Sequence, residues 1–125
     1  MIGRALVLGT FLITCLSACD WARDAAGLTA ELEGRYPGSR IEIDDMHENG
    51  ARRVAVTILA PQFAEDLDVA REAREVAKVV HRRYELGSPS DTVLVEFRSE
   101  RRVGPFTSSR EARFVYPASE LSGSD

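Results

Sequence analysis

Apolar and polar residues alternate with a period of two in four segments of this chain. The pattern in residues 40–44 and 52–59 predicts two half-buried strands. Asn49-Gly50 marks the turn between them, in a hairpin loop expected to be longer than two residues. Residues 92–98 and 112–116 alternate in the same way and predict two further strands.

Two other segments carry apolar residues at steps of three and four, which predicts helices. The first has Ala25, Leu28 and Leu32 at helical spacing and ends at Pro37-Gly38-Ser39. The second opens at Pro61 and stops at Gly87-Ser88-Pro89-Ser90, and we expect Leu67 and Val80 to point into the sheet. Its apolar stripe consists of Phe63, Leu67, Ala70, Ala73, Ala77, Val80 and Tyr84.

The resulting order is α-β-β-α-β-β, which predicts an α+β domain over residues 28–117 with a polar tail at 118–125. We expect one four-stranded sheet with both helices on one face. Moving the last strand to the front would give the ferredoxin-like plan β-α-β-β-α-β. Under that permuted plan the strands lie in the order 92–98, 112–116, 52–59 and 40–44.

The N-terminus has the parts of a secretory signal. Arg4 precedes an apolar run over residues 5–16, which is shorter than the roughly 20 residues of a membrane-spanning helix. Asp20 and Arg23 follow shortly, so a span is not completed downstream. An ordinary secretory cleavage site would place the bulky Leu16 where a small residue is preferred.

Leu16-Ser17-Ala18-Cys19 resembles the lipobox of bacterial lipoproteins. The resemblance implies removal of residues 1–18 by cleavage between Ala18 and Cys19, and attachment of lipid to the Cys19 sulfur, a strong nucleophile. Residues 19–27 then form the lipidated start and a tether, or the fraying first turn of the helix. The acyl chains, palmitate among them, would hold the protein in the bilayer.

The cysteine content and the charge of the chain that remains after cleavage limit the kinds of partner it can have. The removed segment contains Cys15, so the mature chain would have neither a free thiol nor a disulfide. Its charge becomes more negative than the −4 of the full chain, which argues against a nucleic-acid partner. Lipid attachment places the protein on the extracytoplasmic side of a membrane. Asp20 is either an inner-membrane retention signal, as in enterobacterial lipoproteins, or an ordinary linker residue.

Two sets of residues are of the types that bind metals or take part in catalysis, but the sequence lacks the spacing or the partner residues that such sites need. Asp44, Asp45, His47 and Glu48 lack the spacing of a calcium loop or a zinc site, and we expect a solvated hairpin loop there. His81 has no recognisable nucleophile motif to serve, and we expect it on a helix surface. The sequence therefore predicts no catalytic residue, no metal and no cofactor.

The connection over residues 98–110 is the best candidate for a binding surface. It is longer than most hairpin loops, and its Gly104-Pro105 tip is flanked by Val103 and Phe106. Arginines beside an apolar wedge suit anionic headgroups or an acidic protein, although a mobile solvated loop is the competing interpretation. The candidate residues are Arg98, Arg101, Arg102, Phe106 and Arg110.

These observations predict a membrane-anchored envelope lipoprotein that acts as a non-enzymatic protein–protein interaction module. The alternatives are a module that binds a small ligand or lipid and, more distantly, a membrane-tethered hydrolase. A concave apolar pocket would favour the ligand-binding alternative, whereas a flat exposed sheet edge or face would favour a protein partner.

Overall fold

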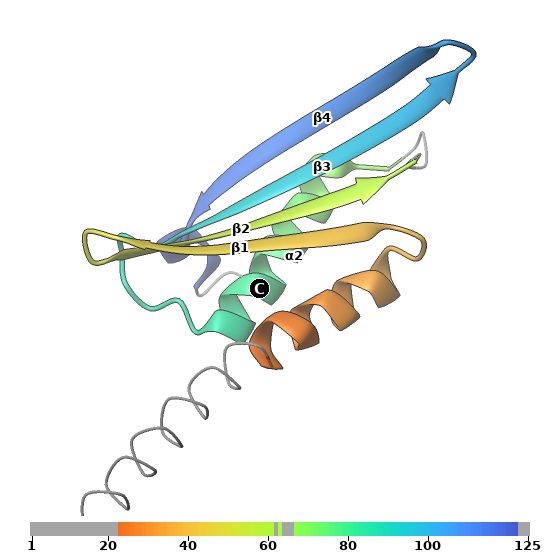
Figure 1. The fold of residues 1–125 in the computed structure, drawn as a ribbon. Coiled ribbons are helices and arrows are strands. Elements are labelled where there is room, and N and C mark those ends of the chain that lie inside the picture. Colours follow the sequence, from red (N-terminus) through yellow and green to blue (C-terminus); the bar gives the residue numbers. More distant parts are fainter. Residues whose placement is uncertain (1–22, 62, 64–66, 123–125) are drawn as a thin grey trace, which may run out of the picture.

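A computed structural model describes residues 23–61, 63 and 67–122 of the chain (Figure 1). The N-terminal helix covers residues 23–35 of the described part, so residues 23–27 are helical. It is followed by β1 (Arg40–Glu48), β2 (Ala51–Ala60), α2 (Val69–Tyr84), β3 (Thr92–Val103), β4 (Phe106–Pro117) and α3 (Ala118–Leu121). The predicted α+β class, with a four-stranded sheet and helices in this order, is confirmed.

The hairpin between β1 and β2 is tighter than its sequence predicts. Glu48 pairs with Ala51, which leaves Asn49 and Gly50 as the whole turn. Both have positive φ, 52° and 78°, the signature of a type I′ turn. The prediction of a longer loop is therefore wrong, because this turn lets β1 and β2 remain paired up to Glu48 and Ala51, directly beside the two turn residues.

The order of the strands also differs from the permuted ferredoxin-like plan. The sheet runs β1-β2-β3-β4, with β2 and β3 parallel at its centre and each outer pair antiparallel. The inward side chains of β2 and β3 are almost fully buried, which requires central positions. β1 and β4 alternate with exposed residues and lie at the edges.

α2 is shorter than predicted, and its buried face is shifted. It begins after Asp68, whose carboxylate accepts a hydrogen bond from the Arg71 backbone N–H at 3.2 Å. Leu67 lies before the helix and is half-buried, and Ala70 is exposed. Val80 is fully buried as expected. The buried residues of the helix are Ala73, Val76, Ala77, Val80 and Tyr84.

The helices and the inner face of the sheet enclose the core. Leu28 and Leu32 of the N-terminal helix are fully buried against the residues of β2, β3 and α2. The domain also extends beyond residue 117, because Leu121 of α3 is 5% exposed and belongs to the core. In the described part of the chain, all fully or nearly buried core residues lie between Leu28 and Leu121, so a chain beginning at Asp20 contains the whole of this core.

Candidate functional site

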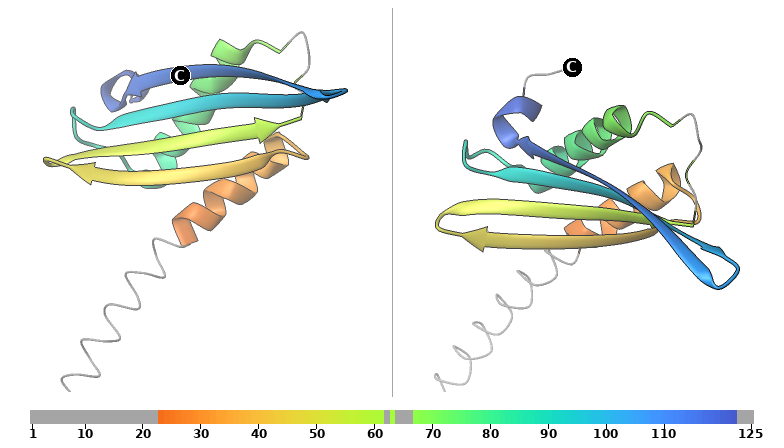
Figure 2. Two further views of the ribbon diagram at one scale, coloured as in Figure 1. Left: turned by 45° about the horizontal axis from the view of Figure 1, so that its top comes forward. Right: turned by 90° about the horizontal axis from the view of Figure 1, so that it is seen from above.

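The predicted loop over residues 98–110 is a two-stranded β-ribbon. β2 ends at Ala60, opposite Ser99, and β3 and β4 continue past it. Residues 100–103 and 106–109 therefore pair only with each other, and we refer to residues 100–109 as the arm. Figure 1 shows the arm projecting beyond the sheet, and Figure 2 (right) shows it bending away from α2.

A two-residue turn closes the arm. Val103 pairs with Phe106, and the turn consists of Gly104 and Pro105. Gly104 has φ +60°, and proline holds its own φ near −65°, so the turn belongs to type II′. Such turns match the twist of a ribbon, which explains why a segment expected as a loop forms paired strands instead.

The two faces of the arm carry different side chains. Residues directly opposite in an antiparallel pair share a face, so Arg101 and Ser108 lie on the same face as the neighbouring pair Ser99 and Arg110. Arg102 lies on the opposite face. The predicted arginines thus do not form one cluster.

The tip of the arm carries two neighbouring exposed apolar side chains. Val103 is 55% exposed and Phe106 is 75% exposed. They face each other across the turn on the side that carries Arg101 and Arg110. This side of the arm therefore combines two cations with an apolar end.

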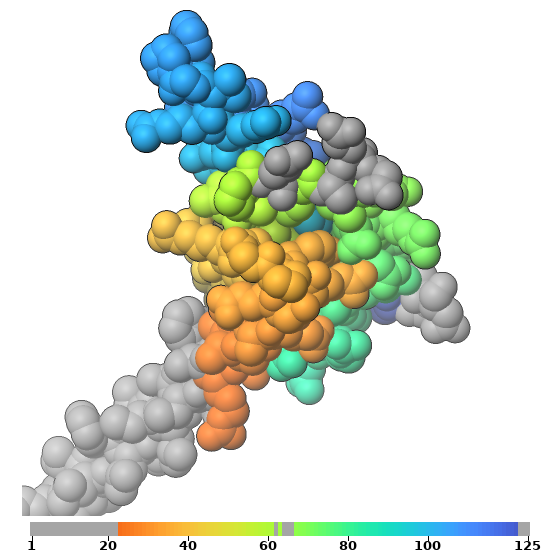
Figure 3. Space-filling model, turned by 90° about the vertical axis from the view of Figure 1, so that its right-hand side faces the viewer, coloured from red at the N-terminus to blue at the C-terminus, as the bar shows by residue number. Residues whose placement is uncertain are grey.

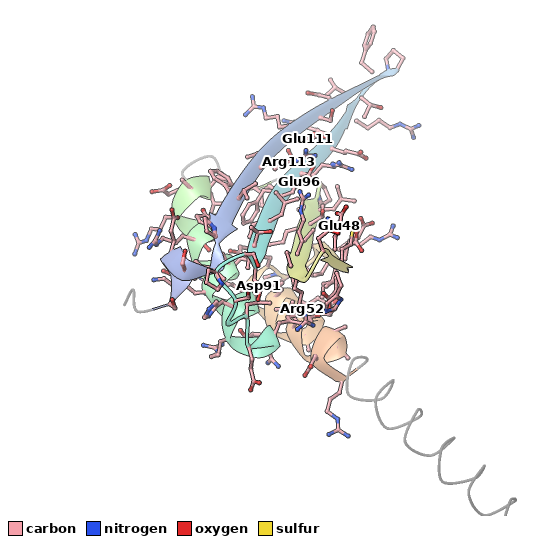
Figure 4. All side chains as sticks on the ribbon, turned by 90° about the vertical axis from the view of Figure 1, so that its left-hand side faces the viewer. Glu48, Arg52, Asp91, Glu96, Glu111 and Arg113 are labelled. Carbon is pink, nitrogen blue, oxygen red and sulfur yellow. The ribbon has the colours of Figure 1, made fainter. Side chains whose placement is uncertain are left out.

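Arg98 takes no part in that surface. Its Nη2 donates to Glu96 Oε1 at 3.0 Å, and its Nε lies 3.1 Å from Glu111 Oε1. The hydrogen bond with Glu96 raises the pKa of Arg98, and the negative charge of Glu111 raises it further. Arg113 approaches the same Glu96 carboxylate at 3.5 Å (Figure 4). The predicted binding residue Arg98 is thus a structural partner at the base of the arm.

A groove of about 500 Å³ lies between the arm and the described residues Pro61, Phe63 and Leu67, which precede α2. Figure 3 shows the arm standing above the end of β2. The described residues that line it are Pro61, Phe63, Leu67, Val69, Phe97, Ser99, Arg101, Val103, Ser108, Arg110, Glu111 and Ala112. Phe106 is not among them.

Aromatic contacts hold the floor of this groove. The ring of Phe97 meets Phe63 edge to face at 5.5 Å and Tyr36 at 5.7 Å. Tyr36 donates its hydroxyl to Glu72 Oε2 of α2, and Arg35 pairs with the same carboxylate at 3.3 Å. Burial and the hydrogen bond to Glu72 raise the pKa of Tyr36.

The sequence did not predict this floor. Phe63 and Leu67 were assigned to the helix stripe, whereas Phe97 was one apolar residue of a strand. Their meeting depends on the end of β2 at Ala60 and on the start of α2 at Val69. No local pattern in the sequence marks either boundary as the wall of a groove.

The other predicted candidates lie elsewhere. Asp45 of β1 forms an ion pair with Arg52, so it belongs to a strand and not to a solvated loop. His81 lies on α2 and is partly buried, between Val80 and Arg82. Among the described residues no group of three or more histidine, cysteine or acidic side chains is arranged to hold a metal ion.

Cys19 and the expected cleavage site lie outside the described residues. Within residues 23–61, 63 and 67–122, no helix is both long and apolar enough to cross a membrane. Comparison with models of known protein families, with curated proteins and with solved structures gives no match. The arm and its groove are therefore interpreted from their own geometry and chemistry.

Proposed function

We propose that this protein is an envelope lipoprotein that acts without catalysis, by holding another envelope protein at the arm. The arm carries this proposal, because residues 100–109 leave the sheet and end in the exposed apolar pair Val103 and Phe106. In this proposal an acylated Cys19 anchors the protein on the extracytoplasmic side of a membrane.

The composition of the arm is that of a contact surface. An exposed apolar patch beside polar residues marks an interaction site more often than isolated apolar residues do. Aromatic residues and arginine are enriched in protein interfaces. Arg101 and Arg110, on the same face as Phe106, favour a partner with an acidic surface.

The placement of the arm favours a protein over the headgroups of the membrane that holds the anchor. The described start of the N-terminal helix and the tip of the arm lie at opposite ends of the molecule (Figures 1 and 3). Cys19 precedes that start closely in the sequence. An anchor at this position would keep the arm directed away from its own bilayer.

Photo-crosslinking from membranes tests the proposal with the full-length protein. A crosslinking amino acid at Phe106 should capture a discrete partner band, whereas one at Met46 should not. Met46 is 42% exposed and lies on β1, paired with Arg53 at the far end of the sheet. Capture of the same bands from both positions would contradict a contact through the arm.

A charge reversal distinguishes electrostatic attraction between the arm and an acidic partner from crosslinking to whichever protein lies nearby. Arg101→Glu with Arg110→Glu should abolish capture from Phe106, and added salt should weaken capture by the unmodified arm. Salt acts because screening lengths fall to about 8–10 Å near physiological ionic strength. Capture that is insensitive to both changes would show that an acidic partner surface is not involved.

A further inference from the structure

The groove beside the arm has an amphiphilic lining. Phe97, at its floor, is 3% exposed, and Phe63 and Leu67 are partly buried beside it. Arg101 and Arg110 lie on the wall that the arm provides. Apolar and cationic groups thus face the same hollow from different elements of the fold.

The cationic wall is not neutralised within the described residues. Neither Arg101 nor Arg110 forms an ion pair with another described residue. Among the described residues that line the groove, Glu111 is the acidic one, and its carboxylate already lies 3.1 Å from Arg98 Nε. Within the part of the chain that the structure describes, both guanidinium groups thus remain able to pair with an anion in the groove.

The register of the arm places both arginines on one face. Arg101 is opposite Ser108, and Arg110 is opposite Ser99, so the two arginines are diagonal neighbours. Diagonal neighbours on one face lie about 7–8 Å apart, within reach of two long side chains that converge on one anion. The hydroxyls of Ser99 and Ser108 can donate further hydrogen bonds there.

We propose that this groove binds a single-chain anionic amphiphile, of which a long-chain fatty acid is the simplest example. Its carboxylate would lie between Arg101 and Arg110, because hydrogen bonds between guanidinium and carboxylate are charge-assisted. Its alkyl chain would cover Phe63, Leu67 and Phe97. A volume of about 500 Å³ suits one small ligand, since ligand pockets span about 300–1,000 Å³.

This inference does not depend on the proposed protein contact. Phe106 lies at the tip of the arm and does not line the groove. Leu67 lines the groove and is not part of the arm. A ligand could therefore bind while the partner contact fails, or the reverse.

Titration of residues 20–125, which contain the whole core, tests the inference. Laurate and dodecyltrimethylammonium have the same chain length and opposite head charge, and both are used below their micellar concentrations. Laurate should bind saturably with one site, and the cation at least about tenfold more weakly, as expected for charged hydrogen bonds. In an NMR titration, the largest changes in backbone amide chemical shift should occur at Phe97, Ser99 and Arg101.

Matched variants locate the site. Arg101→Gln with Arg110→Gln should weaken laurate binding about 10- to 100-fold. Arg102→Gln is the control for a lost charge on the opposite face and should change the affinity less than about twofold. Leu67→Ser should weaken binding of both amphiphiles, and Phe106→Ser should leave laurate binding unchanged.

Four results would overturn the inference. The first is equal affinity for the two amphiphiles, and the second is unchanged laurate binding by the double glutamine variant. The third is an equal loss in Arg102→Gln, which would assign the effect to overall charge. Saturable binding of a poly-glutamate peptide without any laurate binding would also overturn it and would assign the groove to a protein partner.

Discussion

Arg52 holds Asp45 with two nitrogens of its guanidinium, at the end of the sheet opposite the arm. Nε lies 3.0 Å from Oδ1 and Nη2 lies 2.7 Å from Oδ2, in the fork geometry of a strong ion pair. Arg52 also donates to the backbone carbonyl of Tyr84 at 3.3 Å and lies 5.0 Å from its ring centroid. This pair therefore joins both strands of the first hairpin to the end of α2.

Removing this arginine should destabilise the fold. Arg52→Met should lower the free energy of unfolding by about 2–3 kcal/mol, because Asp45 would keep a buried charge without its partner. The estimate is below the value for a fully buried pair, since the Arg52 side chain is 27% exposed. Urea unfolding measures it. Arg53→Met, at an exposed neighbouring position, should change stability by less than about 0.5 kcal/mol, and equal losses would contradict the assignment.

The same pair predicts a pH dependence. The hydrogen bonds from Arg52 lower the pKa of Asp45 relative to the unfolded chain. Its contribution to stability is therefore complete above the unfolded pKa of about 3.9 and is lost as the pH falls through the lower folded pKa. The stability difference between the unmodified protein and Asp45→Asn should shrink as the pH falls below about 4. A difference that is constant from neutral pH to pH 3 would refute this role.

The corrected start of α2 predicts which leucine supports the core. Leu32→Ala should cost about 2–5 kcal/mol, since Leu32 is fully buried. Leu67→Ala should cost less than half as much, because Leu67 precedes α2 and is only half-buried at the groove. Unfolding in urea compares them directly. A larger loss of stability for Leu67→Ala than for Leu32→Ala would mean that Leu67 packs in the core on the face of the helix, as the sequence pattern predicts.

The turn of the arm predicts a local effect without a global one. Gly104→Ala should strain the turn by about 1–3 kcal/mol, because φ near +60° is unfavourable for residues with a β-carbon. Hydrogen exchange should quicken over residues 100–109, while core amides and overall unfolding remain unchanged. Gly34→Ala is the control, since Gly34 lies in a helix with open space around its α-carbon. Acceleration spread over the whole domain would mean that the arm is coupled to the core.

The proposed anchor has a direct chemical test. Protein extracted from membranes should carry an acylated cysteine at its N-terminus, with residues 1–18 removed. Cys19→Ala should retain the leader, run at the larger precursor size and incorporate no fatty acid, because the cysteine sulfur would be the site of lipid attachment. Recovery of Cys19→Ala at the mature size and still in the detergent phase would exclude lipidation at this residue.

Local patterns in the sequence are enough to predict the kinds of elements and most of their positions. Alternation with a period of two marked all four strands, because side chains of a half-buried strand point to opposite faces in turn. Steps of three and four marked Leu28, Leu32 and Val80, which are all fully buried. Asn49-Gly50 marked its turn. These are short-range signals, set by the geometry of neighbouring residues on one element.

The tertiary structure decided which elements meet. Strand order depends on which faces are buried after assembly, so the central pair of β2 and β3 was missed although their inward residues were identified. The sequence predicts a loop where the arm forms, because six of its ten exposed residues are charged or polar, and only the pairing of β3 with β4 makes it a ribbon. The groove combines Phe63, Phe97 and Arg101 from three separate segments. Contacts between segments follow from packing of the whole chain, and local periodicity carries no information about them.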